Sequence, residues 1–257
     1  MQDLEITING LKIHYKVFGE GKPFLFLHGW GSSAEKWDSI AEEVSKGVPG
    51  GPGPFRVFVP DLPGFGKSDA LLEPWNTNKY IRFLEEFIEE LGLKEFYILG
   101  HSFGGALACK IAINHPQQIE KLFLVSAAFV RKRTIKKQVL GRVSKIVKIF
   151  SFLPFYPLAK KAFYKYVVGS YDYSKAEGVM KSTFLNVVSD DLSQFVAFIK
   201  VPTAIIWGDK DEATLVEDAY FLNEKIKGSR LEIISGAGHS LHKDVPEFLV
   251  KKVLENI

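Results

Sequence analysis

Three residue types that together perform nucleophilic catalysis occur in order along the sequence: a serine, an acid and a histidine. Ser102 lies in the run LGHSFGGA, Asp211 in WGDKDEAT and His239 in SGAGHSLH. A serine hydroxyl attacks a carbonyl group when a neighbouring base removes its proton, and that base is oriented by an acid. Asp209 is a second candidate for the acid, because it stands only two residues before Asp211. This order of residues indicates acyl transfer at Ser102.

Acyl transfer also requires two N–H groups directed at the oxygen on which negative charge develops. Phe103 follows the candidate nucleophile directly and would supply one N–H from the start of a helix. Trp30 lies between two glycines in the run HGWGSS, and its backbone would supply the other. We therefore expect Trp30 and Phe103 to form an oxyanion hole.

The pattern Gly-x-Ser-x-Gly is common by chance, so its position relative to strands and helices must decide its meaning. Short apolar runs that end in glycine or an acid predict buried strands at residues 23–29, 55–61, 96–102, 121–127, 203–209 and 230–235. Apolar residues at helical spacing predict helices at 77–91, 104–114, 214–226 and 244–256, with Thr77 and Asp244 as N-caps. A further strand pair is expected at the N-terminus, turning at Asn9 and Gly10.

This alternation of strands and helices predicts an α/β protein with a mostly parallel, doubly wound sheet covered by helices on both faces. Ligands of such sheets bind at the carboxyl ends of the strands. Ser102, Asp211 and His239 all follow predicted strands. The candidate residues are therefore expected at one edge of the sheet.

The alternation is interrupted once, between residues 128 and 192, by helix-like basic segments. We predict a catalytic core of residues 1–127 and 193–257, with a helical cap, or lid, inserted as residues 128–192. Residues 131–181 contain thirteen Lys and Arg but only two acids. This charge could attract acidic substrates or an anionic lipid surface, or it could be a solvated face resting on an acidic core.

Aromatic side chains of the cap are candidates for an apolar acyl pocket. The substrate-binding candidates are His28, Phe129, Phe152 and Phe155, and the alternative is that the aromatic residues form the cap's own core. We also expect His28 and His101 to hydrogen-bond backbone groups near the site.

No membrane-spanning segment is expected in the cap, because its longest uncharged run, residues 149–159, has 11 residues and two prolines. The first residues carry acids and alternate polar with apolar side chains, unlike a signal peptide. The chain has one cysteine, which is typical of a reducing compartment. We therefore predict a cytoplasmic protein. The sequence does not define its oligomeric state.

Five motifs, HGWG, DLPGFGKS, GHSFGG, WGDKD and GAGHS, occur in this order over nearly the whole chain. The set resembles the α/β-hydrolase superfamily, in its small, capped, esterase-like branch. The resemblance implies the nucleophile, base and acid of a catalytic triad and two oxyanion donors, at Ser102, His239, Asp211, Trp30 and Phe103 respectively.

The sequence departs from the family pattern near the acid. The family commonly has a proline shortly after this residue, where the present chain has Leu215. The spacing G-x-x-D from Gly208 favours Asp211, and Asp209 remains the alternative.

The resemblance implies a serine hydrolase that cleaves carboxylic esters with short to medium acyl chains. One alternative keeps the triad but attacks another bond, such as that of a lactone, a monoacylglycerol, a vinylogous diketone or an aminoacyl amide. Another alternative is a non-catalytic receptor or scaffold. Relatives that cleave epoxides or carbon–halogen bonds are disfavoured because they use aspartate where Ser102 stands.

We expect a small-molecule ester as substrate and neither metal nor organic cofactor. His239 and His242 have no accompanying cluster of carboxylates or thiolates in the sequence. The run GFGKS has Asp61 where a phosphate-binding loop requires glycine, so nucleotide binding is not expected. No nucleic-acid partner is expected either.

Overall fold

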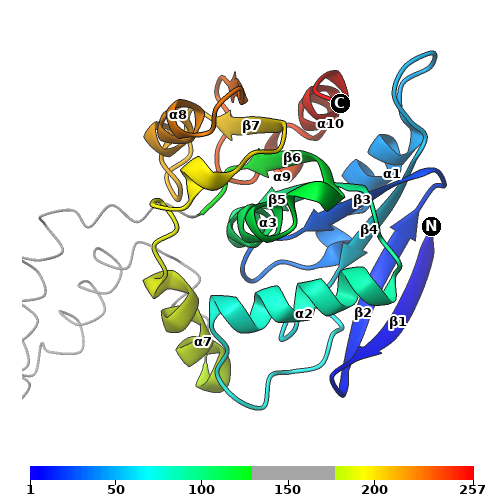
Figure 1. Ribbon diagram of the computed structural model, residues 1–257, viewed down its shortest axis with the longest axis vertical. Helices are drawn as coiled ribbons and strands as arrows, with labels where there is room; N and C mark the ends of the chain where they lie inside the picture. Colours follow the sequence, from blue (N-terminus) through cyan, green and yellow to red (C-terminus); the bar gives the residue numbers. More distant parts are fainter. Residues whose placement is uncertain (129–176) are drawn as a thin grey trace, which may run out of the picture.

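An eight-stranded sheet organises the chain in the computed structural model, which describes residues 1–128 and 177–257 (Figure 1). The strands are β1 (Gln2–Ile8), β2 (Leu11–Phe18), β3 (Lys22–Leu27), β4 (Phe55–Pro60), β5 (Phe96–His101), β6 (Ile119–Val125), β7 (Thr203–Gly208) and β8 (Arg230–Ile234). Their order across the sheet is β1-β2-β4-β3-β5-β6-β7-β8. The pairs β1–β2 and β2–β4 are antiparallel and all others are parallel, which confirms the predicted mostly parallel sheet.

The antiparallel edge begins with the predicted turn at Asn9 and Gly10. Both residues have positive φ, 50° and 78°, and Ile8 pairs with Leu11 across them. A two-residue turn of this kind matches the twist of the two strands it joins, and asparagine followed by glycine is its preferred sequence.

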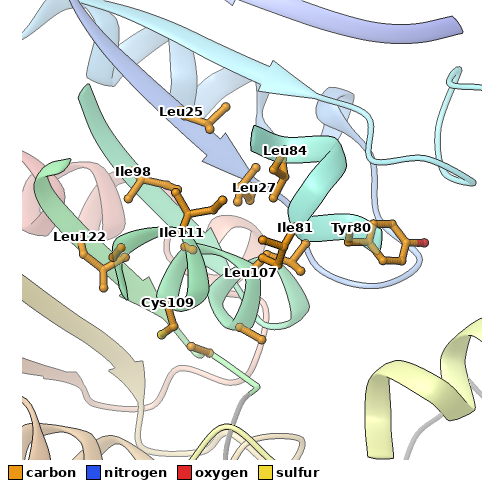
Figure 2. Close-up of a cluster of buried hydrophobic side chains, with 14 of the residues drawn as sticks. Leu25, Leu27, Tyr80, Ile81, Leu84, Ile98, Leu107, Cys109, Ile111 and Leu122 are labelled. Atoms are coloured by element: carbon orange, nitrogen blue, oxygen red, sulfur yellow. The ribbon is translucent and has the colours of Figure 1, made fainter. Parts of the chain in front are cut away.

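Helices cover both faces of the sheet, as the sequence predicts. The helices of one face are α2 (Thr77–Glu90), α3 (Phe103–Asn114) and α8 (Val216–Lys225), which share one buried apolar cluster with the sheet. The helices of the other face are α1 (Asp38–Lys46), α9 (Leu241–Asp244) and α10 (Pro246–Glu255), which share a second cluster. Figure 2 shows part of the first cluster, where side chains of α2 and α3 meet those of the central strands.

The remaining helices of residues 1–128 and 177–257 are short or lie beside the core. They are α7 (Gly178–Ser189) and three 3-10 turns, η1 (Ala34–Trp37), η2 (Pro116–Gln118) and η3 (Val196–Phe198). Within residues 1–128 and 177–257, no helix is both long and apolar enough to cross a bilayer.

Two predicted helix N-caps are wrong. The N-cap of α2 is Asn76, whose side chain accepts a hydrogen bond from the Lys79 N–H at 3.0 Å, one residue before the expected Thr77. Asp244 ends α9 instead of starting the last helix, and its carboxylate accepts a hydrogen bond from the Gly238 N–H. The last helix starts with Pro246, because proline has the fixed φ of a helix and the first turn needs no N–H donor from it.

Helix α7 is the main described part of the predicted cap, residues 128–192. Its Thr183 hydroxyl oxygen accepts a hydrogen bond from the Trp75 N–H, and its Asn186 amide donates to the Trp75 carbonyl, both at 3.0 Å. These two bonds hold α7 on the loop before α2. Residues 129–176, which contain the rest of the predicted cap, lie outside the described residues.

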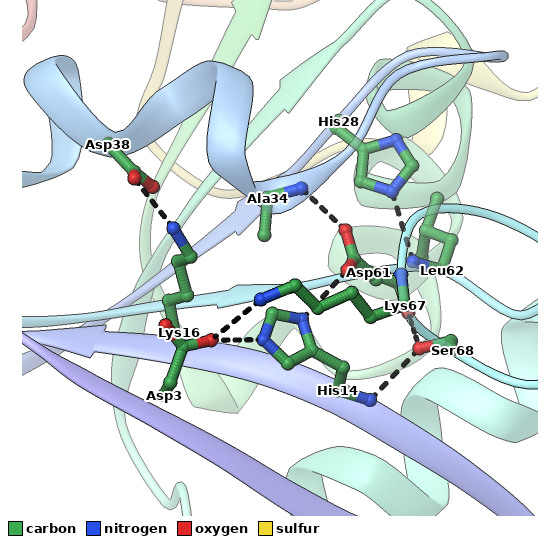
Figure 3. A network of polar contacts seen from close by, with 10 residues as sticks. All are labelled: Asp3, His14, Lys16, His28, Ala34, Asp38, Asp61, Leu62, Lys67 and Ser68. Atoms are coloured by element: carbon green, nitrogen blue, oxygen red, sulfur yellow. Dashed lines mark hydrogen bonds and ion pairs between the residues drawn. The ribbon is translucent and has the colours of Figure 1, made fainter.

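A buried carboxylate joins the loops after β3 and β4 to strand β2 (Figure 3). Asp61 is 2% exposed and accepts hydrogen bonds from the Ala34 N–H at 2.6 Å and the Lys67 N–H at 2.9 Å. His14 Nδ1 lies 2.7 Å from the same carboxylate, and His14 Nε2 contacts Asp3. A buried charge is tolerated only when it is well hydrogen-bonded, so these donors and the loop conformations depend on one another.

Gly66 is required by this arrangement. Its φ is +55°, and a Cβ atom at this position would lie 2.1–2.3 Å from the carboxylate atoms of Asp61. Gly92 has a similar φ of +64°, but a Cβ atom there would have no neighbour within 4 Å.

We expect Gly66→Ala to lower the free energy of unfolding by about 3 kcal/mol, because the methyl group must displace a buried carboxylate in addition to the strain of positive φ. The control, Gly92→Ala, should cost only the backbone strain, about 1 kcal/mol. Urea unfolding of both variants measures the difference. Equal losses would show that Asp61 moves freely.

Candidate active site

Ser102 occupies the sharp turn between β5 and α3. Its φ and ψ are 51° and −116°, a conformation that residues other than glycine rarely adopt and that commonly marks a functional site. The neighbouring glycines make this turn possible. A Cβ atom at Gly100 would lie 2.3 Å from the Gly104 carbonyl oxygen, and a Cβ atom at Gly104 would lie 2.2 Å from the Leu27 carbonyl oxygen.

The side chain of Ser102 is not used to cap the helix that follows it. Its backbone is held instead, since its N–H donates to the Val125 carbonyl at 3.1 Å and its carbonyl accepts from the Gly105 N–H at 2.9 Å. Phe103 opens α3, so its N–H belongs to the first turn, where helix N–H groups have no acceptor within the helix. The turn thus presents a hydroxyl beside an N–H donor.

The predicted base and acid are in contact. His239, in the loop after β8, has its Nδ1 atom 2.9 Å from Asp211 Oδ2, in the loop after β7. Asp211 is 4% exposed, and its Oδ1 accepts hydrogen bonds from the Ala213 N–H at 2.9 Å and the Thr214 N–H at 2.8 Å. Burial by itself would raise the pKa of Asp211, but hydrogen bonds from His239 and Thr214 keep that pKa below its ordinary value.

This geometry defines the roles of the two nitrogens of His239. An ionised carboxylate only accepts hydrogen bonds, so Nδ1 of His239 must donate to Asp211. In the neutral ring Nε2 is then the atom with a free lone pair, which can take a proton. The pair can therefore act as a general base.

The two candidate acids have different surroundings. Asp209 accepts a hydrogen bond from the Gly236 N–H at 2.7 Å and one from the Ser235 hydroxyl at 3.2 Å, so it holds the turn after β8. Asp211 is the carboxylate that contacts His239. The geometry thus favours Asp211 over Asp209.

The loop after β3 lies against the turn at Ser102. A Cβ atom at Gly29 would be 2.9 Å from His101 Nδ1 and 3.2 Å from Ser102 Cβ. The next residue, Trp30, packs its ring on Phe103, with the ring centroids 5.6 Å apart. The rings of the two residues predicted to supply the oxyanion donors are therefore in contact.

His28 is not suited to the substrate contact considered for it. The residue is fully buried, its Nδ1 donates to the Gly29 carbonyl at 2.8 Å, and its Nε2 accepts from the Leu62 N–H at 3.0 Å. Burial lowers the pKa of His28, which keeps the ring neutral. The ring joins the loops after β3 and β4, as expected from the prediction of backbone hydrogen bonds. Phe129, Phe152 and Phe155 lie outside the described residues.

Two further histidines pack behind His239. His101 lies with its Nε2 2.9 Å from the His239 carbonyl oxygen, and burial keeps the pKa of His101 well below its ordinary value. His242 stacks on Trp37, with ring centroids 4.7 Å apart, and burial lowers the pKa of His242 to about 4. Within residues 1–128 and 177–257, no group of three or more His, Cys, Asp or Glu is arranged to hold a metal ion.

Thr214 is the contact that the sequence reasoning missed. Its hydroxyl donates to Asp211 Oδ2 at 2.8 Å and lies 3.3 Å from His239 Nδ1. The available signal was the spacing Asp-x-x-Thr, because an aspartate side chain often accepts hydrogen bonds from residues two and three positions later.

The model of the family described as the alpha/beta hydrolase fold matches residues 22–161, more than half of the chain. The chain therefore belongs to the α/β-hydrolase fold family. Membership is consistent with the doubly wound sheet and with a strained serine turn between β5 and α3.

Similar proteins of this family carry different names. Lipase 1 of Psychrobacter immobilis is 26% identical over 92% of this chain and 79% of the lipase. The 2-hydroxy-6-oxononadienedioate/2-hydroxy-6-oxononatrienedioate hydrolase of Klebsiella pneumoniae is 26% identical over 89% of this chain and 85% of that protein. The solved structure of an esterase from Exiguobacterium antarcticum is 25% identical, covers 96% of both chains and has a TM-score of 0.72.

Buried neutral histidines should make the protein less stable in mild acid. The unfolded chain takes up a proton at His242 near its ordinary pKa of 6.5, whereas in the folded protein His242 stays neutral down to about 4. Stability is therefore lost as the pH falls through 6.5, by about 2 kcal/mol at pH 5 from this residue.

We expect His242→Phe to flatten the decline in unfolding free energy between pH 7.5 and pH 5, because phenylalanine can keep the stack on Trp37 and takes up no proton. Urea unfolding at several pH values measures this. If the variant and the parent protein lose the same free energy, protonation of the unfolded chain at His242 is not the cause.

Proposed function

We propose that this chain is a serine hydrolase that cleaves carboxylic esters with short to medium acyl chains through an acyl-enzyme on Ser102. The observation that carries the proposal is the 2.9 Å contact between His239 Nδ1 and the buried carboxylate of Asp211, on loops at the same end of the sheet as the strained turn of Ser102. A serine nucleophile, a base and an acid held in this way are the parts of a catalytic triad.

In the proposed reaction, Nε2 of His239 removes the proton from the Ser102 hydroxyl while the serine oxygen attacks the ester carbonyl carbon. The carbonyl oxygen becomes negative and receives hydrogen bonds from the N–H groups of Trp30 and Phe103. The protonated His239, stabilised by Asp211, then gives its proton to the departing alcohol. Water deprotonated by His239 attacks the acyl-enzyme. The Ser102 oxygen then leaves with the proton returned by His239, which releases the acid and restores Ser102.

A second reaction class uses the same residues. The relative from Klebsiella pneumoniae carries the name of a 2-hydroxy-6-oxononadienedioate/2-hydroxy-6-oxononatrienedioate hydrolase, so cleavage of a C–C bond next to a carbonyl group is the alternative substrate chemistry. The lipase and esterase names of the other two relatives favour esters. We also propose a cytoplasmic location, which suits a chain whose single cysteine, Cys109, is buried and free.

Ser102→Ala should abolish hydrolysis of p-nitrophenyl esters and labelling by a fluorophosphonate while leaving the thermal unfolding temperature within a few degrees of the parent. The reason is that the reacting oxygen is removed without loss of a helix cap. Esters of increasing chain length, assayed beside a vinylogous diketone, separate the two substrate classes. Full activity of the alanine variant would refute the proposed nucleophile, and an unlabelled parent protein would favour a non-catalytic scaffold.

The two candidate acids allow a matched comparison. Asp211→Asn should lower kcat by about 10³-fold to 10⁴-fold, because asparagine cannot stabilise the charged imidazole. Asp209→Asn removes a carboxylate of the same loop that contacts Gly236 and Ser235 instead of His239, so kcat should stay within about threefold. Steady-state kinetics on one ester measures both, and the opposite order of effects would move the acid to Asp209.

A further inference from the structure

We infer that Thr214 is a positioning residue for the acid–base pair, acting through its hydroxyl on the carboxylate of Asp211. The inference rests on the proposed function, in which Asp211 orients His239. Thr214 is the third residue after Asp211. Its hydroxyl would orient the Asp211 carboxylate from the Oδ2 side, which the backbone N–H groups of the loop do not reach.

Thr214 binds both oxygens of the carboxylate. Its N–H donates to Oδ1 of Asp211 and its hydroxyl donates to Oδ2, each at 2.8 Å. The N–H of Ala213 is a second donor to Oδ1, at 2.9 Å, and His239 is the second group on Oδ2, at 2.9 Å. The hydroxyl and the imidazole therefore share one oxygen, and together they fix the plane of the carboxylate.

The backbone of Thr214 is itself held in place by the core. The indole N–H of Trp207, a fully buried residue of β7, donates to the Thr214 carbonyl at 2.9 Å. The Thr214 hydroxyl also lies 3.2 Å from the carbonyl oxygen of Ser126, in the segment after β6. A hydroxyl has one proton to donate, and the shorter contact to a charged oxygen is the stronger of the two.

Loss of this hydroxyl should change the chemistry of the pair in a defined direction. The positive end of the hydroxyl dipole points at Asp211, so its removal makes the carboxylate a better acceptor of protons and a stronger partner of the imidazolium. Both effects raise the proton affinity of the His239–Asp211 pair. The titratable groups that face Asp211 are His239 and, behind it, His101, which burial keeps neutral.

Two pairs of variants isolate the hydroxyl. The parent and Thr214→Val have side chains of the same shape, in which a methyl group replaces the hydroxyl. Thr214→Ser keeps the hydroxyl without the methyl group, and Thr214→Ala lacks both. Within each pair the difference is the hydroxyl. In each pair the chain with the hydroxyl should have a kcat about tenfold higher, because the hydroxyl fixes the plane of the carboxylate that orients His239, and KM should stay within about twofold. The acid limb of the kcat/KM profile should lie about half a pH unit higher in the chain without the hydroxyl.

Equal kcat values and equal acid limbs within both pairs would overturn the inference. A loss that follows the methyl group, with serine as impaired as alanine, would also overturn it, because it would indicate packing. If valine prevents folding, the serine and alanine pair still gives the answer.

A measurement without substrate separates this inference from the proposed function. A histidine N–H bonded to a carboxylate gives a proton resonance at low field, which His239→Gln removes and so assigns. We expect this resonance to shift in Thr214→Val and Thr214→Ala but to stay close to its parent position in Thr214→Ser. An unshifted resonance in the first two variants would refute the positioning role, even if the parent hydrolyses no ester. A shifted resonance in a protein that reacts with no ester or fluorophosphonate would refute only the proposed function.

Discussion

The strained backbone at Ser102 is the constraint on which the rest of the site depends. A residue with a side chain at φ 51° costs about 1–2 kcal/mol relative to ordinary helix or strand conformations, and the surrounding structure must supply that energy. Close backbone contacts supply this energy. The Ser102 N–H donates to the Val125 carbonyl of β6, and Gly104 lies directly against the carbonyl of Leu27 at the end of β3. Three neighbouring strands thus share one tight junction. The positions of the loops after β3 and β6 follow from that junction.

Two buried carboxylates show how similar parts serve structure in one place and, in the proposed function, chemistry in the other. Asp61 and Asp211 each follow a strand, accept two or more backbone N–H bonds and contact a histidine. His14 has carboxylates at both ring nitrogens, Asp61 at Nδ1 and Asp3 at Nε2, so its ring is fully engaged. Among the described residues, the ring hydrogen-bond contacts of His239 are confined to Nδ1. The second ring nitrogen of His239 can therefore accept a proton, whereas both nitrogens of His14 are occupied in joining parts of the structure.

How well the sequence predicts a feature of this structure depends on whether neighbouring residues or residues far apart in the sequence determine it. Buried parallel strands appear as continuous apolar runs, so β3 to β8 fall within two residues of their expected ends. Helix starts are less certain because Asn76 and Thr77 are both good capping residues, and only the folded backbone selects Asn76. The choice between Asp209 and Asp211 depends on a contact 28 residues away in the sequence. The hydroxyl of Thr214 has the same dependence, because its partner His239 reaches it only after β8 has paired with β7.

The aromatic contacts around Trp30 explain how the loop that carries this proposed oxyanion donor keeps its shape. The Trp30 ring packs edge-on against Phe65 at 4.8 Å, Phe184 at 5.1 Å and Phe103 at 5.6 Å, and these three phenylalanines are themselves buried. Hydrogen-bond donors stabilise a developing charge best when they need not move to reach it. Phe184 belongs to α7, which is anchored to the Trp75 backbone by Thr183 and Asn186. Helix α7 therefore has a direct packing path, through Phe184, to the ring of the proposed oxyanion donor.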